Sequence, residues 1–163
     1  MKKSSALLCS TLTLLLAASA YSAHASGEPM ARAELVSKSE LIVIGKLHDR
    51  KELDATWATA TLTIHETLKG DATIHDVTLK FLAKPGSTAT WTYTGDEDGI
   101  WFIKKDGDGE KPTWSTFYAG GRIPTSVPSD EGKKEIAAAL VEIKKLIAEQ
   151  QEAPPPKAAA PNK

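Results

Sequence analysis

Residues 56–68 read TWATATLTIHETL, and apolar and polar side chains alternate along nearly the whole stretch. One face carries Ala58, Ala60, Leu62, Ile64 and Leu68, and the other carries Trp57, Thr59, Thr61, Thr63, His65 and Thr67. A period of two is the side-chain period of a β-strand, and threonine favours this conformation because its branched side chain packs well on a pleated surface. The stretch therefore predicts a long strand with one buried face, and it indicates a β-rich domain.

The segments on both sides show related patterns, separated by glycine, proline and aspartate residues that favour turns. Residues 41–44 are four consecutive apolar residues, which predict a strand buried on both faces. The charged stretch 48–54 is expected to form the turn between these two strands. Further strands are expected at residues 77–81, 88–94, 100–103 and 113–119. Strands joined by short turns favour antiparallel pairing, and about five of them can close into a small barrel.

A short helix is expected before these strands and a longer helix after them. Residues 29–37 begin with a proline, which is tolerated in the first turn of a helix. Ser129 is a suitable N-cap for a second helix that runs to about residue 151. Its apolar stripe consists of Ile136, Leu140, Ile143 and Ile147. Such a stripe predicts packing against the rest of the domain, with a partner-facing helix as the alternative.

The two ends of the chain differ in composition from the part between them. Lys2 and Lys3 precede an apolar run, and Ala23 to Ala25 fits a small-x-small cleavage site, so residues 1–25 are interpreted as a signal peptide. Residues 26–151 are expected to form one domain. Residues 152–163 are expected to form a disordered Pro/Ala/Lys tail. The processed protein is then periplasmic or secreted and has no transmembrane segment.

Charge and cysteine content exclude several classes of site. The formal charge of −1 becomes −3 when Lys2 and Lys3 are removed with the signal peptide, and this balance argues against a nucleic-acid partner. The only cysteine is Cys9, so the domain has no disulfide, no thiolate metal site and no thiol nucleophile. No serine-hydrolase elbow, phosphate-binding loop or dinucleotide fingerprint occurs, and no cofactor is expected.

Three aromatic residues are the leading candidates for a ligand-binding surface: Trp57, Trp91 and Tyr93. Trp57 lies on the threonine face of its strand, and the other two share a face of theirs. Exposed aromatic rings on the strands of a barrel can stack on sugars or pack on proteins. The alternative is that these rings fill the barrel or pack under the C-terminal helix, as large aromatic residues usually do.

His65 and His75 form the one candidate metal site. If the chain turns near Gly70, these two histidines could face each other across a hairpin, with a carboxylate nearby as a third ligand for zinc or copper. No tight histidine spacing enforces such a site, so two exposed polar residues are the alternative.

Three stretches of the chain resemble the superfamily of tissue inhibitors of metalloproteinases and netrin modules, especially short bacterial secreted relatives. They are residues 33–47, residues 62–70 with their closing Leu-Lys-Gly turn, and residues 99–103 with the Asp-Gly turn and the strand that follow. The resemblance implies an OB-like barrel with flanking helices and a protein that binds proteins or polymers outside the cytoplasm. The mature N-terminal cysteine with which the inhibitors chelate zinc is absent here, so no inhibitory residue is transferred.

The expected function is that of an exported, non-catalytic binding module for an extracytoplasmic protein or polysaccharide. Two alternatives are a metal-binding or hydrolytic enzyme that uses the region of His65 and His75, and a structural component of the cell envelope.

Overall fold

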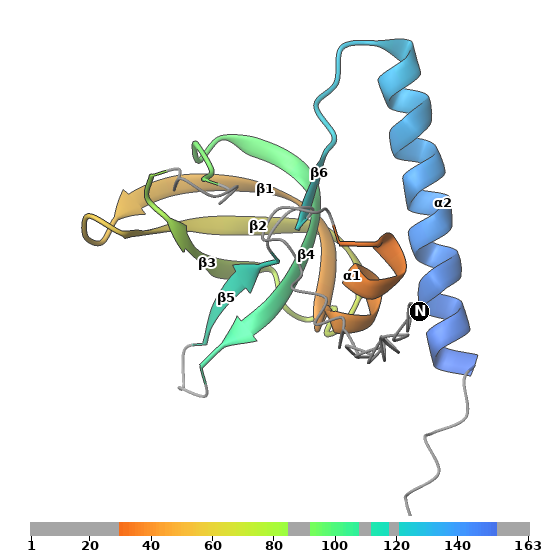
Figure 1. Ribbon diagram of the computed structural model, residues 1–163, viewed down its shortest axis with the longest axis horizontal. Helices are drawn as coiled ribbons and strands as arrows, with labels where there is room; N and C mark the ends of the chain where they lie inside the picture. Colours follow the sequence, from red (N-terminus) through yellow and green to blue (C-terminus); the bar gives the residue numbers. More distant parts are fainter. Residues whose placement is uncertain (1–29, 85–91, 108–111, 118–120, 153–163) are drawn as a thin grey trace, which may run out of the picture.

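Six strands and two helices make up the described part of the chain (Figure 1). The computed structural model describes residues 30–84, 92–107, 112–117 and 121–152. In chain order the elements are α1 (Arg32–Lys38), β1 (Leu41–Glu52), β2 (Trp57–Lys69), β3 (Asp76–Leu82), β4 (Glu97–Asp106), β5 (Thr113–Thr116), β6 (Arg122–Pro124) and α2 (Asp130–Glu152). The predicted mainly β class, with a short helix before the strands and a longer one after them, is confirmed.

Five of the strands form a barrel-like ring in the order β1-β2-β3-β5-β4, and β4 returns to β1. All neighbours are antiparallel except β3 and β5, which run parallel, so the sheet is mixed rather than fully antiparallel as expected. The reason is geometric: strand directions can alternate around a closed ring only when the number of strands is even. A ring of five therefore contains at least one parallel pair. Here that pair is reduced to a single partnership, Leu79 with Trp114.

Strands β1, β3 and β4 are longer than the sequence patterns predict, whereas β5 is shorter than the strand expected at residues 113–119. The charged stretch expected as a turn instead continues β1 to Glu52, where Lys51 and Glu52 pair with the beginning of β2. A register shift between His48 and Lys51, with Asp49 at a φ of 54°, lets the strand bend there. Of the strand expected at 88–94, only residues 92–94 are described, and they are not in a strand; the remainder lies outside the described residues. Strand β6 was not expected.

Two apolar cores lie on the two faces of this ring. The inner core fills the ring with side chains such as Val43, Leu62 and Trp101. The outer core lies between the ring and the two helices and includes Ile42 and Phe102. Strands β1 and β4 contribute alternate residues to the two cores, so both strands are buried on both faces. This confirms the interpretation of the apolar run at residues 41–44.

Gly45 allows β1 and β2 to approach closely inside the ring. A Cβ atom at this position would lie 2.4 Å from the carbonyl oxygen of Thr63, closer than any real contact of this kind. The register of the pair shifts between Ile44 and Gly45, which marks a bulge. The buried carbonyl of Gly45 accepts a hydrogen bond of 3.0 Å from the indole Nε1 of Trp101, so the bulge also provides the hydrogen-bond acceptor for this fully buried side chain.

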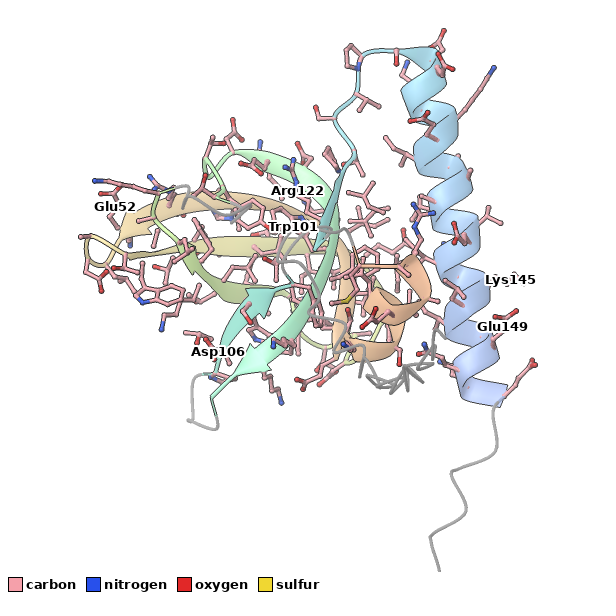
Figure 2. The ribbon with its side chains drawn as sticks, viewed as in Figure 1. Glu52, Trp101, Asp106, Arg122, Lys145 and Glu149 are labelled. Atoms are coloured by element: carbon pink, nitrogen blue, oxygen red, sulfur yellow. The ribbon has the colours of Figure 1, made fainter. Side chains whose placement is uncertain are left out.

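Helix α2 packs against α1 and the outer face of the ring through one side only (Figure 1). The Ser129 hydroxyl accepts a hydrogen bond from the amide of Gly132, so the predicted N-cap is confirmed. Ile143 and Ile147 are buried, whereas Lys145 and Glu149 point outward from the helix (Figure 2). No helix among the described residues has the length and apolar character needed to cross a membrane.

Candidate functional site

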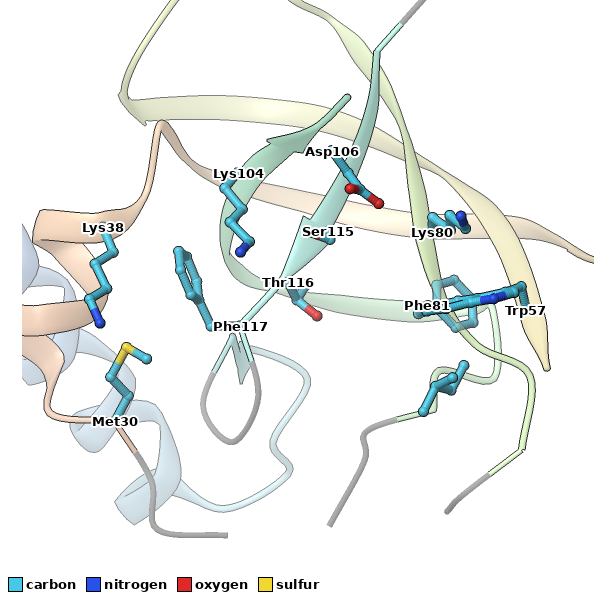
Figure 3. Close-up of a pocket in the computed structure, with 11 residues that line it drawn as sticks. Met30, Lys38, Trp57, Lys80, Phe81, Lys104, Asp106, Ser115, Thr116 and Phe117 are labelled. Atoms are coloured by element: carbon cyan, nitrogen blue, oxygen red, sulfur yellow. The ribbon is translucent and has the colours of Figure 1, made fainter. Parts of the chain in front are cut away.

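A groove of about 450 Å³ opens where β3 and β5 separate (Figure 3). Beyond the pair of Leu79 with Trp114, β3 continues through Leu82 and β5 through Thr116, and both strand ends line the groove. Its volume lies within the usual range for small-ligand pockets. The groove therefore opens to solvent beside the parallel pair of β3 and β5 that closes the ring.

The floor of the groove is apolar and is formed where the two cores approach the surface. Phe81 belongs to the inner core and is 5% exposed, and Phe117 belongs to the outer core and is 8% exposed. Trp57, at the start of β2, forms one wall and is 37% exposed. Met30 lies beside Phe117, at the end of the groove near α1 (Figure 3). The four side chains give the groove an apolar surface that reaches from α1 to the first residue of β2.

Lysine side chains dominate the rim. Lys38, Lys80 and Lys104 line the groove, together with a single acid, Asp106. The Nζ of Lys80 lies 4.7 Å from the centre of the Trp57 ring, and the Nζ of Lys104 lies 5.5 Å from that of Phe117. A cation over an aromatic face is attracted to its electron-rich surface. Within the described part of the chain, neither of these two lysines has a carboxylate in ion-pair contact.

Asp54 holds the hairpin that presents Trp57. Its Oδ1 accepts hydrogen bonds from the backbone amides of Thr56, at 2.7 Å, and of Trp57, at 2.8 Å. These two bonds, the Thr56 bond first, lower the pKa of the Asp54 carboxyl below its ordinary value. Aspartate at such a turn stabilises it by accepting amides two or three residues ahead. Asp54 therefore holds the backbone from which the Trp57 ring projects to the groove. The sequence pattern indicated only that Asp54 belongs to a charged turn.

The three aromatic residues that the sequence nominated fall into different environments. Trp57 lies at the groove. Tyr93 is buried inside the ring, where its ring packs edge-on against Phe81 at 5.2 Å and against Trp101 at 5.1 Å. Its hydroxyl donates to Thr116 Oγ1 at 3.0 Å, and burial raises the pKa of that hydroxyl. Trp91 lies outside the described residues. Tyr93 therefore supports the groove from beneath instead of facing a ligand.

The two histidines of the candidate metal site are both exposed but are not opposite each other. The amide of Ile64 donates to the carbonyl of His75 at 2.8 Å, so the residue across from His75 is Ile64. His65, the next residue along β2, projects to the other face of the strand. Among the residues that the structure describes, no group of three or more histidine, cysteine, aspartate or glutamate side chains could hold a metal ion.

A different histidine takes part in a chain of polar contacts across three strands. His48 Nδ1 lies 2.9 Å from Asp49 Oδ2, and His48 Nε2 lies 2.9 Å from Thr63 Oγ1. The Thr63 hydroxyl in turn donates to Asp76 Oδ1 at 2.5 Å. A hydroxyl has a single proton, and the Thr63 hydroxyl donates that proton to Asp76 rather than to His48. Thr63 is therefore not arranged as a nucleophile that His48 activates as a base. The contacts cross-link β1, β2 and β3.

Sequence reasoning found Trp57 but missed the rest of the groove. Lys80 was an ordinary polar position on an expected strand, Lys104 directly followed the strand expected at residues 100–103, and Phe117 was one residue of a returning strand. The only local sequence signal for the groove was that Trp57 and Lys80 lie on the polar faces of two strands that follow each other in the chain. No family model matches this chain, and no curated protein matches it. The function of the groove therefore has to be inferred from its own shape and chemistry.

Proposed function

We propose that the protein is an exported, non-catalytic binding module that holds an extracytoplasmic protein or polysaccharide in the groove between β3 and β5. The observation that carries this proposal is a half-exposed tryptophan, Trp57, on the wall of an apolar groove of about 450 Å³. Burial of an aromatic surface of this size is among the largest single contributions available to a binding site. The signal-peptide pattern of residues 1–25 supports export.

The position of the groove also supports a binding role. It lies beside the start of β2, just after the β1–β2 turn, and beside Asp106 at the end of β4. Small five-stranded barrels of the OB type commonly bind oligomeric ligands at the face of strands 2 and 3, between the loops that follow strands 1 and 4. Strands fix the walls in place, so a ligand would meet a largely pre-formed surface.

We also propose that the chain is a distant relative of the tissue inhibitor of metalloproteinases and netrin-module superfamily. The five-stranded ring with a short helix before it and a helix after it supports the proposal. The zinc-chelating N-terminal cysteine of the inhibitors has no counterpart here, since the only cysteine is Cys9. The proposed relationship therefore concerns the fold and a binding role, and not protease inhibition.

The experiment is affinity capture with matched variants. Cells express the full chain, and the exported protein is purified and immobilised against envelope and secreted fractions of the source cells. The variant is Trp57→Ala. The control is Leu53→Ala, because Leu53 is 59% exposed in the same hairpin but does not line the groove. A protein or polysaccharide that is retained by the parent and by the control, but lost by the variant, is the expected result. Equal retention by all three would contradict a ligand site at the groove.

A further inference from the structure

We infer that the ligand of the groove is an extended acidic polypeptide segment that adds as a strand to the edge of β3 facing β5, with apolar side chains alternating with carboxylates. This inference rests on the proposed function and gives its ligand a chemical class. It combines three features of the groove: free strand edges, an apolar floor and a cationic rim.

The ends of β3 and β5 offer strand edges at the groove. Only Leu79 and Trp114 join β3 to β5, although β3 continues to Leu82 and β5 continues to Thr116. Within the described residues, the backbone at these two strand ends has no partner across the seam. Unpaired amide and carbonyl groups at a strand edge are the template on which an extended peptide can pair. The groove thus offers hydrogen-bonding groups for a polypeptide backbone.

The floor and the rim match the two faces of such a strand. Side chains of an extended peptide point alternately to opposite sides. Those directed to the inner face of the ring would meet Phe81, whereas Phe117 belongs to the outer core on the opposite face. Those directed outward would meet Lys80 and Lys104, whose ammonium groups have no carboxylate partner among the described residues. Asp106 is the single opposing charge on the lining. Charge complementarity therefore favours acidic side chains on the outer face of the ligand.

The same residues favour a polypeptide over an acidic polysaccharide. A sugar ring stacks on an open aromatic face. Phe81 and Phe117 are only 5% and 8% exposed, so they offer little open face. The Trp57 ring is the more exposed one, but the Nζ of Lys80 already lies 4.7 Å from its centre. The regularly spaced backbone groups along this edge of β3 match the spacing of a peptide backbone, with which they can form a strand ladder.

The test measures fluorescence anisotropy of a labelled peptide in which valine and glutamate alternate, with the purified exported protein. Lys80→Gln and Lys104→Gln should each weaken binding by up to about fivefold, the usual size of an exposed ion pair. Lys145→Gln is the matched control, because Lys145 lies on the outer side of α2, where it pairs with Glu149 at 3.7 Å (Figure 2). Thermal unfolding of all variants checks that they fold alike.

A second peptide set tests strand pairing directly. N-methylation of every second amide, in each of the two registers, keeps the charges and side chains but removes the hydrogen-bond donors of one strand edge. We expect at least one register to bind about tenfold more weakly, the upper range for lost hydrogen bonds. Equal binding by both methylated peptides and the parent would overturn strand addition. Binding of oligogalacturonate, with no binding of the peptide, would overturn the inference and leave the proposed function intact. The affinity-capture experiment with Trp57→Ala tests the proposed function separately.

Discussion

Trp57 and Trp101 are two tryptophans of one β-ring with opposite surroundings. Trp101 is fully buried, donates its indole hydrogen bond to Gly45, and has the guanidinium of Arg122 5.2 Å from its ring centre. Trp57 is 37% exposed, and a lysine from the neighbouring strand covers part of its ring. Every group around Trp101 belongs to the chain itself, whereas one side of Trp57 faces an open groove. The difference separates aromatic residues that hold the fold from an aromatic residue left available for a ligand.

Arg122 links the surroundings of Trp101 to neighbouring segments through its two terminal nitrogens, although its buried Nε has no hydrogen-bond partner within the described residues. Its Nη1 pairs with Glu97 Oε2 at 2.5 Å, and its Nη2 donates to the carbonyl of Asp98 at 2.9 Å. Glu97 Oε1 also accepts the backbone amide of Thr94 at 2.6 Å. This network ties β4, β6 and the segment before β4 together around the tryptophan. Lys80 and Lys104 have no comparable partners in the described part of the groove.

The largest effect is expected at the buried tryptophan. Trp101→Ala removes a fully buried tryptophan from the inner core and leaves the Gly45 carbonyl without its donor. We expect the free energy of unfolding to fall by about 3–5 kcal/mol, as for other large aromatic-to-alanine changes in cores. Denaturant unfolding followed by tryptophan fluorescence measures this change. A loss no larger than that of Trp57→Ala would refute the contrast between the two residues.

Gly45→Ala should have the next largest effect. The new Cβ would lie 2.4 Å from the Thr63 carbonyl oxygen, so the β1–β2 bulge that accepts the Trp101 hydrogen bond has to move. We expect a cost of about 1–3 kcal/mol, the usual range for overpacking. The control is Gly107→Ala, which meets no atom within 4 Å but has a φ of +96°. That variant measures the cost of backbone strain without a steric clash. Gly45 has no positive φ, so a loss well below about 1 kcal/mol in Gly45→Ala would argue against its steric role.

Acid should weaken the hairpin of Trp57 through Asp54. Its folded pKa is lowered by amide hydrogen bonds, so the stability it contributes is present above its unfolded pKa of about 3.9 and is lost as the pH falls through the folded value. Asp54→Asn keeps an oxygen acceptor but removes the charge. The parent should therefore be more stable than the variant at neutral pH, and this advantage should shrink below about pH 4. Parallel denaturant titrations from neutral to acid pH measure it, and a pH-independent difference would contradict the mechanism.

Trp57→Ala should have the smallest effect on stability and a large effect on binding. We expect the free energy of unfolding to change by about 0.5 kcal/mol or less, as at many partly exposed positions. Retention of the captured ligand should be lost in the same variant. Thermal unfolding and affinity capture on the same preparation test both statements. A large loss of stability would mean that Trp57 belongs to the core after all.

Most of the strands could be predicted because their signals are local. Period-two alternation at residues 56–68 identified β2, and the apolar run at residues 41–44 identified the buried half of β1. The extension of β1 to Glu52 was missed, because its charged residues form a strand only through pairing with β2. The presence of a parallel pair could also have been predicted from a closed ring of five strands. An odd number of strands cannot alternate in direction around a closed circuit.

The candidate site was less predictable than the strands, for a similar reason. Trp57 could be nominated because it interrupts a polar face with a large apolar ring. Tyr93 was nominated by the same argument, yet it fills the ring, since residues 92–94 are not in a strand and alternation does not hold there. Lys80, Lys104 and Phe117 lie on three different segments, and no sequence spacing relates them. Their proximity follows from the closure of the ring.

The sequence alone determined the class of this protein: alternating residues dictate strands, Ser129 begins the last helix, and the single cysteine excludes a disulfide in the chain. These properties depend on each residue and its near neighbours along the chain. Only the tertiary structure decided which aromatic residues are buried, where the two parallel strands separate, and which lysines border the resulting groove. Those outcomes depend on how distant strands pair, because burial and charge at a position are set by what the closed ring brings against it.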